Sequence, residues 1–166
     1  YAGGICGYIY YGTVTDCISN VTVTATGKMD RLNAGSIAGF NQSYIFNCYA
    51  TGKIESTATA RFVSLGGIVG DSNSRIANCA TLNSNISGKD GQTNTYIHRI
   101  TGSNGGYIVN NYASATLPAS GDKGLDKLDG EDCGAKPAAS WWKEPDRWAN
   151  SYTLPSGGEY PLNPWN

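Results

Sequence analysis

Charged residues are scarce in this 166-residue chain: Lys and Arg total 12, Asp and Glu total 13, and together they make up 15% of it. Nucleic-acid binding relies on a clustered basic footprint, so a net charge of −1 argues against that class of partner. No run of eighteen apolar residues is present, and the first seven residues have no basic segment. We expect no membrane insertion, and a soluble segment cut from a longer precursor.

Proline and tryptophan are absent from residues 1–117: all six prolines and all four tryptophans follow Leu117. Proline cannot donate a hydrogen bond to a sheet ladder, so its absence indicates strands. The 22 glycines and the many Ser, Thr and Asn residues are typical of a turn-rich β protein. Two units are therefore predicted, residues 1–117 as sheet and residues 118–166 as a distinct, mildly acidic segment.

Residues 1–117 contain an internal repeat with a period of 31 or 32 residues. Each copy has a glycine box, such as Gly67-Ile68-Val69-Gly70, followed by an Asn/Cys box, such as Ile76-Ala77-Asn78-Cys79. Four copies of near-constant length are predicted to form structural ladders. The isoleucine column is Ile5, Ile37, Ile68 and Ile100; the Asx column is Asp16, Asn47, Asn78 and Asn110; the cysteine column is Cys17, Cys48, Cys79 and, in the fourth copy, Asn111.

A third apolar position closes each copy, so we expect three short strands per copy. These positions are Val23, Ile54, Ile86 and Leu117. No segment has the apolar spacing of an amphipathic helix. One copy is too short to bury a core, but stacking at the strand spacing of about 4.8 Å would build one continuous core. The predicted fold is all-β: a parallel β-helix, or related β-solenoid, of about four coils.

Two strings carry a resemblance to a known repeat: Gly66-Gly67-Ile68-Val69-Gly70, and the ten residues Ile45-Phe46-Asn47-Cys48-Tyr49-Ala50-Thr51-Gly52-Lys53-Ile54. They are similar to the GLUG repeat of bacterial surface proteins, which is common in gut Bacteroidetes and occurs beside immunoglobulin-A protease domains. The resemblance covers about residues 2–117, and the fourth copy departs from it at Arg99, Thr101 and Asn111. It implies a secreted or surface-displayed repeat protein of adhesin type. It implies no catalytic residues, because the motif is structural.

The cysteine column favours free thiols over disulfides. Side chains stacked parallel in a ladder rarely reach the disulfide torsion, whereas a thiol packs well as a small buried apolar group. No cofactor or metal site is expected, because there is no Cys-x-x-Cys pair and His98 is the only histidine. Asx side chains should bond turn backbone or one another along the stack. Glycines should occupy corners where a Cβ would clash; they are Gly7, Gly39, Gly70 and Gly102.

Parallel β-helices also host polysaccharide lyases and hydrolases, which need converging carboxylates. Asp30, Glu55 and Asp90 fall at different positions in their copies, and no Gly-x-Ser-x-Gly elbow accompanies His98. A non-enzymatic module is therefore predicted. Its ligand-binding candidates are Tyr44, Arg75 and Tyr107, which share one column and could meet a sugar or a protein partner. The competing interpretation is that these side chains only pack against neighbouring rungs.

The tail, residues 118–166, is predicted to cap the last coil with its four indoles, Trp141, Trp142, Trp148 and Trp165. Its Trp141-Trp142 pair and Tyr160-Pro161-Leu162 also resemble the ending that follows GLUG repeats. The function we expect is an extracellular, adhesin-like stalk or ligand-presenting scaffold that meets a host protein or glycan surface. A glycan-binding module is the alternative, and a polysaccharide-active enzyme is a third.

Overall fold

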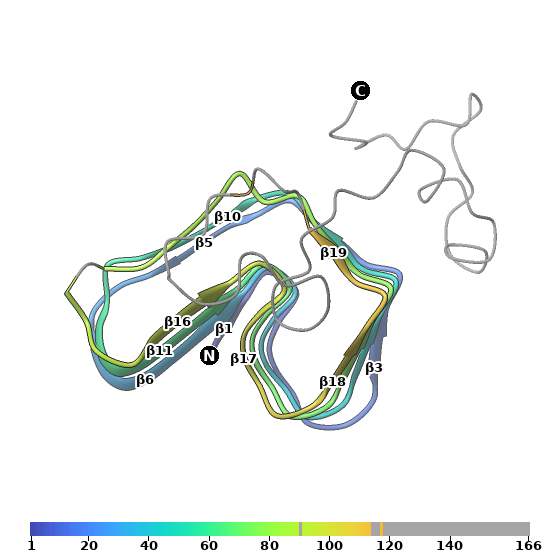
Figure 1. Cartoon of the computed structure of the whole chain (residues 1–166), viewed down its shortest axis with the longest axis horizontal. Helices are drawn as coiled ribbons and strands as arrows, with labels where there is room; N and C mark the ends of the chain where they lie inside the picture. Colours follow the sequence, from blue (N-terminus) through green and yellow to red (C-terminus); the bar gives the residue numbers. More distant parts are fainter. Residues whose placement is uncertain (90, 114–116, 118–166) are drawn as a thin grey trace.

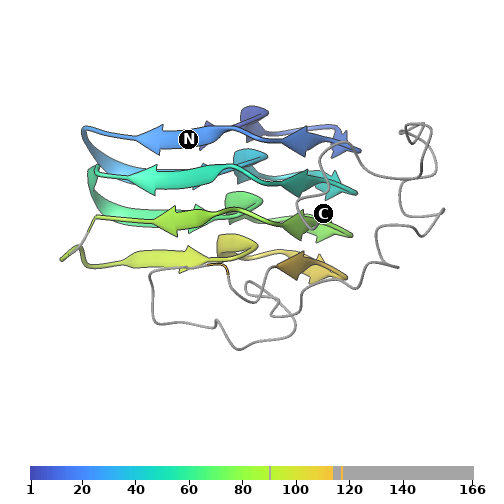
Figure 2. The same ribbon diagram turned by 90° about the horizontal axis from the view of Figure 1, so that it is seen from above.

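The structure, a computed structural model, describes residues 1–89, 91–113 and 117. Within these residues the regular structure is entirely β, with no helix. Successive coils stack so that each strand lies beside its equivalent in the next coil (Figures 1 and 2). The predicted β-solenoid of about four coils is thereby confirmed. The tail and its four tryptophans lie outside the described residues.

In the part of the chain that the structure describes, the strands form five parallel sheets that follow one another around each coil. The first sheet contains β1 (Ala2–Gly3), β6 (Lys28–Gly35), β11 (Thr59–Gly66) and β16 (Thr95–His98). The second contains β2 (Cys6–Ile9), β7 (Ala38–Asn41), β12 (Val69–Ser72) and β17 (Thr101–Asn104). The third contains β3 (Thr13–Thr15), β8 (Tyr44–Phe46), β13 (Arg75–Ala77) and β18 (Tyr107–Val109).

The two remaining sheets complete the coil. The fourth contains β4 (Ile18–Ser19), β9 (Tyr49–Ala50), β14 (Ala80–Thr81) and β19 (Tyr112–Ala113). The fifth contains β5 (Thr22–Ala25), β10 (Lys53–Ser56) and β15 (Asn85–Ser87). The expectation of three strands per coil is therefore wrong. The Asn/Cys box divides into two strands at its Asx corner, and the long strands β6 and β11 mix apolar with small and polar residues.

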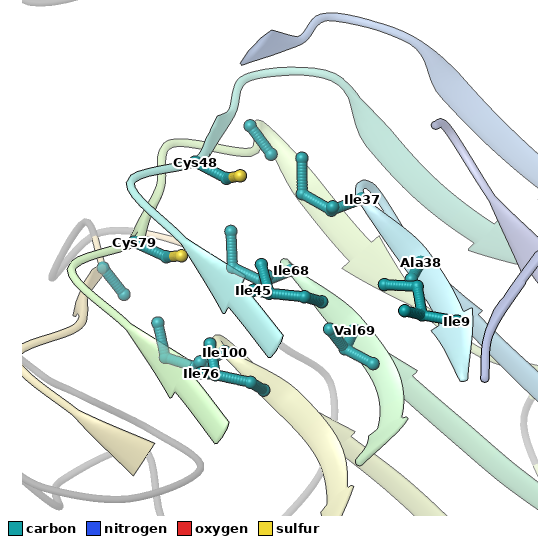
Figure 3. Packing of buried hydrophobic residues seen from close by; sticks show 12 residues of the cluster. Ile9, Ile37, Ala38, Ile45, Cys48, Ile68, Val69, Ile76, Cys79 and Ile100 are labelled. Atoms are coloured by element: carbon teal, nitrogen blue, oxygen red, sulfur yellow. The ribbon is translucent and has the colours of Figure 1, made fainter. Parts of the chain in front are cut away.

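The core consists of two clusters on either side of a narrow neck. One cluster fills the space enclosed by the second, third and fourth sheets, and Figure 3 shows its isoleucines stacked in ladders beside Cys48 and Cys79. The other lies between the first and fifth sheets and includes Leu65, Ile86 and Leu117. Long ladders of like apolar residues thus supply the burial that no single coil could supply.

Glycines build the neck, by close approach of two backbones. A Cβ on Gly70 would lie 2.3 Å from the backbone nitrogen of Ala34, and one on Gly102 would lie 2.4 Å from that of Leu65. These glycines sit inside β12 and β17, which lie against β6 and β11 near the centre of the coil (Figure 1). The expectation of corner glycines is corrected: the chain bends before them, at Ser36-Ile37 in the second coil. They are needed because the backbones of two strands approach closely at these positions and leave no room for a Cβ.

The true corners belong to the Asx column. Asp16, Asn47, Asn78 and Asn110 all have a positive φ, between 51° and 57°. Asn and Asp tolerate this left-handed conformation better than most residues. Asn78 Nδ2 donates to Asn47 Oδ1 at 3.4 Å, and Asn47 Nδ2 donates to Asp16 Oδ1 at 3.2 Å. Three consecutive corners are therefore joined along the stack by side-chain hydrogen bonds.

The first coil differs from the others in burial. Ile37, Ile68 and Ile100 are fully buried, whereas Ile5 keeps its place in the column but is 45% exposed. Cys48 and Cys79 are buried, but Cys17 is only half-buried, so the expectation of an inaccessible thiol does not hold there. Ile5 and Cys17 have a neighbouring coil on one side among the described residues. None of the described residues stacks on the outer side of the first coil.

Candidate functional site

The third sheet carries the residues that the sequence marks as ligand-binding candidates. Tyr44, Arg75 and Tyr107 open β8, β13 and β18, and Arg75 pairs in register with Tyr44 on one side and Tyr107 on the other. Side chains alternate between the two faces of a strand, so the following residue in each strand points into the core. Ile45 and Ile76 occupy those inward positions and are fully buried. The three candidates therefore face outward in one column.

The exposure of these side chains bears on the two interpretations of the column. Tyr44 is 49% exposed and Tyr107 is 63% exposed, and Arg75 is exposed as well. Neither tyrosine is enclosed by the core. Two large rings are thus left in water on one face of the third sheet, on rungs separated by that of Arg75.

A fourth residue, Phe46, completes the surface and was missed by the sequence analysis. Its ring stacks on that of Tyr44, with centroids 5.8 Å apart and an interplanar angle of 13°. The Arg75 guanidinium carbon lies 5.5 Å from the Phe46 centroid and 5.8 Å from the Tyr107 centroid. The spacing i, i+2 from Tyr44 along one strand could have identified Phe46. We call Tyr44, Phe46, Arg75 and Tyr107 the aromatic face.

The aromatic face carries a positive charge without a partner carboxylate. In residues 1–89, 91–113 and 117, ion pairs join Arg31 to Asp71 at 3.6 Å and Lys53 to Glu55 at 3.9 Å, and none involves Arg75. Arg75 is held between two rings, and its planar N–H edge remains available for an acceptor. The surface can therefore offer aromatic stacking and a bidentate donor side by side.

A second aromatic cluster lies on the first coil. Tyr1 and Tyr8 stack with centroids 5.4 Å apart, and both rings contact Phe40 in the next coil at 5.3 Å. Tyr8 also donates a hydrogen bond to Gln42 Oε1 at 2.6 Å. Tyr8 and Phe40 are register partners, so this cluster is a cross-rung ladder like the aromatic face. Tyr1 and Tyr8 are exposed as well, and all three rings contact one another.

A buried carboxylate, Asp71, sits beside this cluster in the second sheet, in register with Phe40. It accepts a hydrogen bond from Asn33 Nδ2 at 3.2 Å and pairs with Arg31. Arg31 in turn lies over the Phe62 ring at 5.1 Å. These contacts give the Asp71 carboxylate a hydrogen-bond donor and an ion-pair partner, and they link the first sheet to the second. We therefore assign Asp71 a structural role.

The environment of the thiols in the cysteine column favours packing and disfavours reactivity. Cys17, Cys48 and Cys79 are free, and each donates to the carbonyl two residues earlier, at 3.2, 3.1 and 3.3 Å. Hydrogen bonding with the Cys79 thiol, together with burial, raises the pKa of Cys48 far above its ordinary value. Burial also raises the pKa of Cys17. No group of three or more His, Cys, Asp or Glu side chains that could hold a metal ion occurs in the described part of the chain.

Comparisons with protein-family models, with curated proteins and with solved structures gave no match.

Proposed function

We propose that this chain is a non-enzymatic repeat module of an extracellular bacterial surface protein, which presents the aromatic face to a ligand in the manner of an adhesin. The observation that carries the proposal is the register alignment of Tyr44, Arg75 and Tyr107 on three consecutive coils, all exposed. A stacked solenoid holds such side chains at a fixed spacing, so little ordering is needed when a ligand binds.

The sequence adds two supports. The similarity of its glycine and Asn/Cys boxes to GLUG repeats favours display outside a bacterial cell. The scattered positions of Asp30 and Glu55 within their coils favour binding over hydrolysis, because general acid–base catalysis needs two convergent groups. Among the described residues, no helix is long and apolar enough to cross a membrane.

An array of glycans and host-matrix proteins tests the proposal. We expect saturable binding of the full chain to at least one ligand, and loss of that binding in a Tyr44→Ala/Tyr107→Ala double variant. Tyr96→Ala is the matched control, because Tyr96 is an exposed tyrosine on the first sheet, away from the aromatic face. Absence of any ligand, or equal loss in the control, would contradict the proposal.

Glycans are the class of ligand that we favour. Exposed rings along one sheet suit the apolar faces of sugar rings, and regularly spaced rungs suit a polymer with a regular repeat. A host protein is the competing ligand, and the array contains both.

A further inference from the structure

The spacing of the aromatic face along the solenoid defines a ligand dimension. Tyr44 and Tyr107 lie two rungs apart, with Arg75 on the rung between them. At a strand spacing of about 4.8 Å, two rungs span roughly 9.6 Å. That length is comparable with one disaccharide unit of an extended, β-linked polysaccharide. A chain laid along the solenoid axis could therefore place alternate sugar rings on the two tyrosines.

The charge of the face defines the chemistry of the intervening sugar. Arg75 has no carboxylate within ion-pair distance in the described residues, and its guanidinium is fixed over Phe46 and Tyr107. A stacked guanidinium keeps its N–H edge for a planar or tetrahedral oxyanion, which it binds through two parallel hydrogen bonds. The complementary group on a sugar is a carboxylate or a sulfate.

We propose that the aromatic face binds an extended, β-linked acidic polysaccharide that runs parallel to the solenoid axis. Its sugar rings stack on Tyr44 and Tyr107, and an anionic group of the sugar between them is bound by Arg75. This inference rests on the proposed function, because it needs the aromatic face to be the ligand-binding surface. It goes further by naming the class of ligand, its direction and the residue that selects for charge.

Three polymers separate the parts of this proposal. Carboxymethylcellulose is β-linked and acidic, hydroxyethylcellulose has the same backbone without the charge, and polyglutamate carries the charge without sugar rings. With affinity measured by calorimetry at low salt, we expect the full chain to prefer carboxymethylcellulose to both other polymers. Cellulose sulfate then distinguishes sulfate from carboxylate as the bound group. Binding should weaken as salt is added, because an exposed charge pair is screened.

Single substitutions test the separate contributions of Arg75 and the two tyrosines to binding. Arg75→Gln should weaken carboxymethylcellulose binding by about tenfold, the loss of one charge-assisted contact, and should abolish the preference over hydroxyethylcellulose. Tyr44→Ala and Tyr107→Ala should weaken both cellulose derivatives. Arg61→Gln is the matched control and should bind as the parent does, because Arg61 is also an exposed arginine over a ring, Phe62 at 5.0 Å, but lies in the first sheet.

The outcomes distinguish failure of this inference from failure of the proposed function on which it rests. Unchanged affinity in Arg75→Gln, or polyglutamate bound as tightly as carboxymethylcellulose, overturns the acidic polysaccharide and in the second case favours an acidic protein partner. A ligand found on the array whose binding depends on Tyr44 but not on Arg75 would leave the proposed function standing and this inference refuted. No binding to any polymer or array ligand overturns both.

Discussion

Asn111 binds the backbone of the preceding coil through both ends of its side-chain amide. Its Oδ1 accepts a hydrogen bond from the Cys79 N–H at 2.8 Å, and its Nδ2 donates to the Ile76 carbonyl at 2.9 Å. Asn111 is buried in the column that cysteine occupies in the other three coils. The departure from the repeat thus replaces a packed thiol with two hydrogen bonds between coils.

Removing that amide should destabilise the fourth coil. Asn111→Ala leaves the Cys79 N–H and the Ile76 carbonyl without their partner, at a cost of about 1–3 kcal/mol in the free energy of unfolding. Asn111→Cys, which restores the residue of the other coils, should cost less, because a thiol can bond its own strand. Urea denaturation measures both. An alanine variant as stable as the parent would show that the two bonds contribute nothing.

The close approach of the two backbones predicts different effects of alanine at two positions of the same glycine column, Gly70 and Gly7. Gly70→Ala forces a Cβ to within 2.3 Å of the Ala34 backbone nitrogen. We expect the free energy of unfolding to fall by at least about 2 kcal/mol. Gly7→Ala meets nothing closer than the Tyr1 carbonyl oxygen at 3.5 Å, and its stability should change by less than about 0.5 kcal/mol. Thermal unfolding of the two variants provides the comparison. Equal effects would show that the two backbones do not approach closely.

Thiol reactivity should follow burial along the cysteine column. Alkylation without denaturant, read peptide by peptide by mass spectrometry, should leave Cys48 and Cys79 unmodified while Cys6 and Cys17 react slowly. The thiolate is the reactive form, and the raised pKa values of Cys6, Cys17 and Cys48 keep it scarce near pH 8. All described cysteines should react in denaturant. Rapid modification of Cys48 or Cys79 in the folded protein would place them outside the core.

Tyr49 should make the fold sensitive to alkali. Burial raises its pKa to about 12, so the unfolded chain releases the phenolic proton at about pH 10 while the folded chain retains it. The unfolded state binds fewer protons between these values, so stability should fall as pH rises from about 10 to 12. Tyr49→Phe should reduce this fall, measured by urea denaturation at pH 8 and pH 11. An identical fall in the variant would contradict the assignment.

The sequence was sufficient to predict the solenoid because each coil repeats the same apolar positions, and parallel stacking follows from a constant period. Phe46 and the strands β6 and β11 were harder to identify from the sequence than the repeat itself. β6 and β11 present Asn33 and Ser64 on one side and Leu32 and Val63 on the other, so they lack a continuous apolar run. The neck could not be predicted, since it depends on how closely two strands approach that are not hydrogen-bonded to each other.

The number of coils between Tyr44 and Tyr107 tests the account most directly, because register defines both the fold and the aromatic face. Deleting residues 45–75 removes one period of 31 residues and joins Tyr44 to Ile76. We predict a shorter β-rich protein that unfolds cooperatively by far-UV circular dichroism, with Tyr44 and Tyr107 on adjacent rungs and no preference for acidic polymers. Deleting residues 45–59 should instead give an unfolded or aggregated chain. Equal tolerance of the two deletions, or failure of both to fold, would contradict the account.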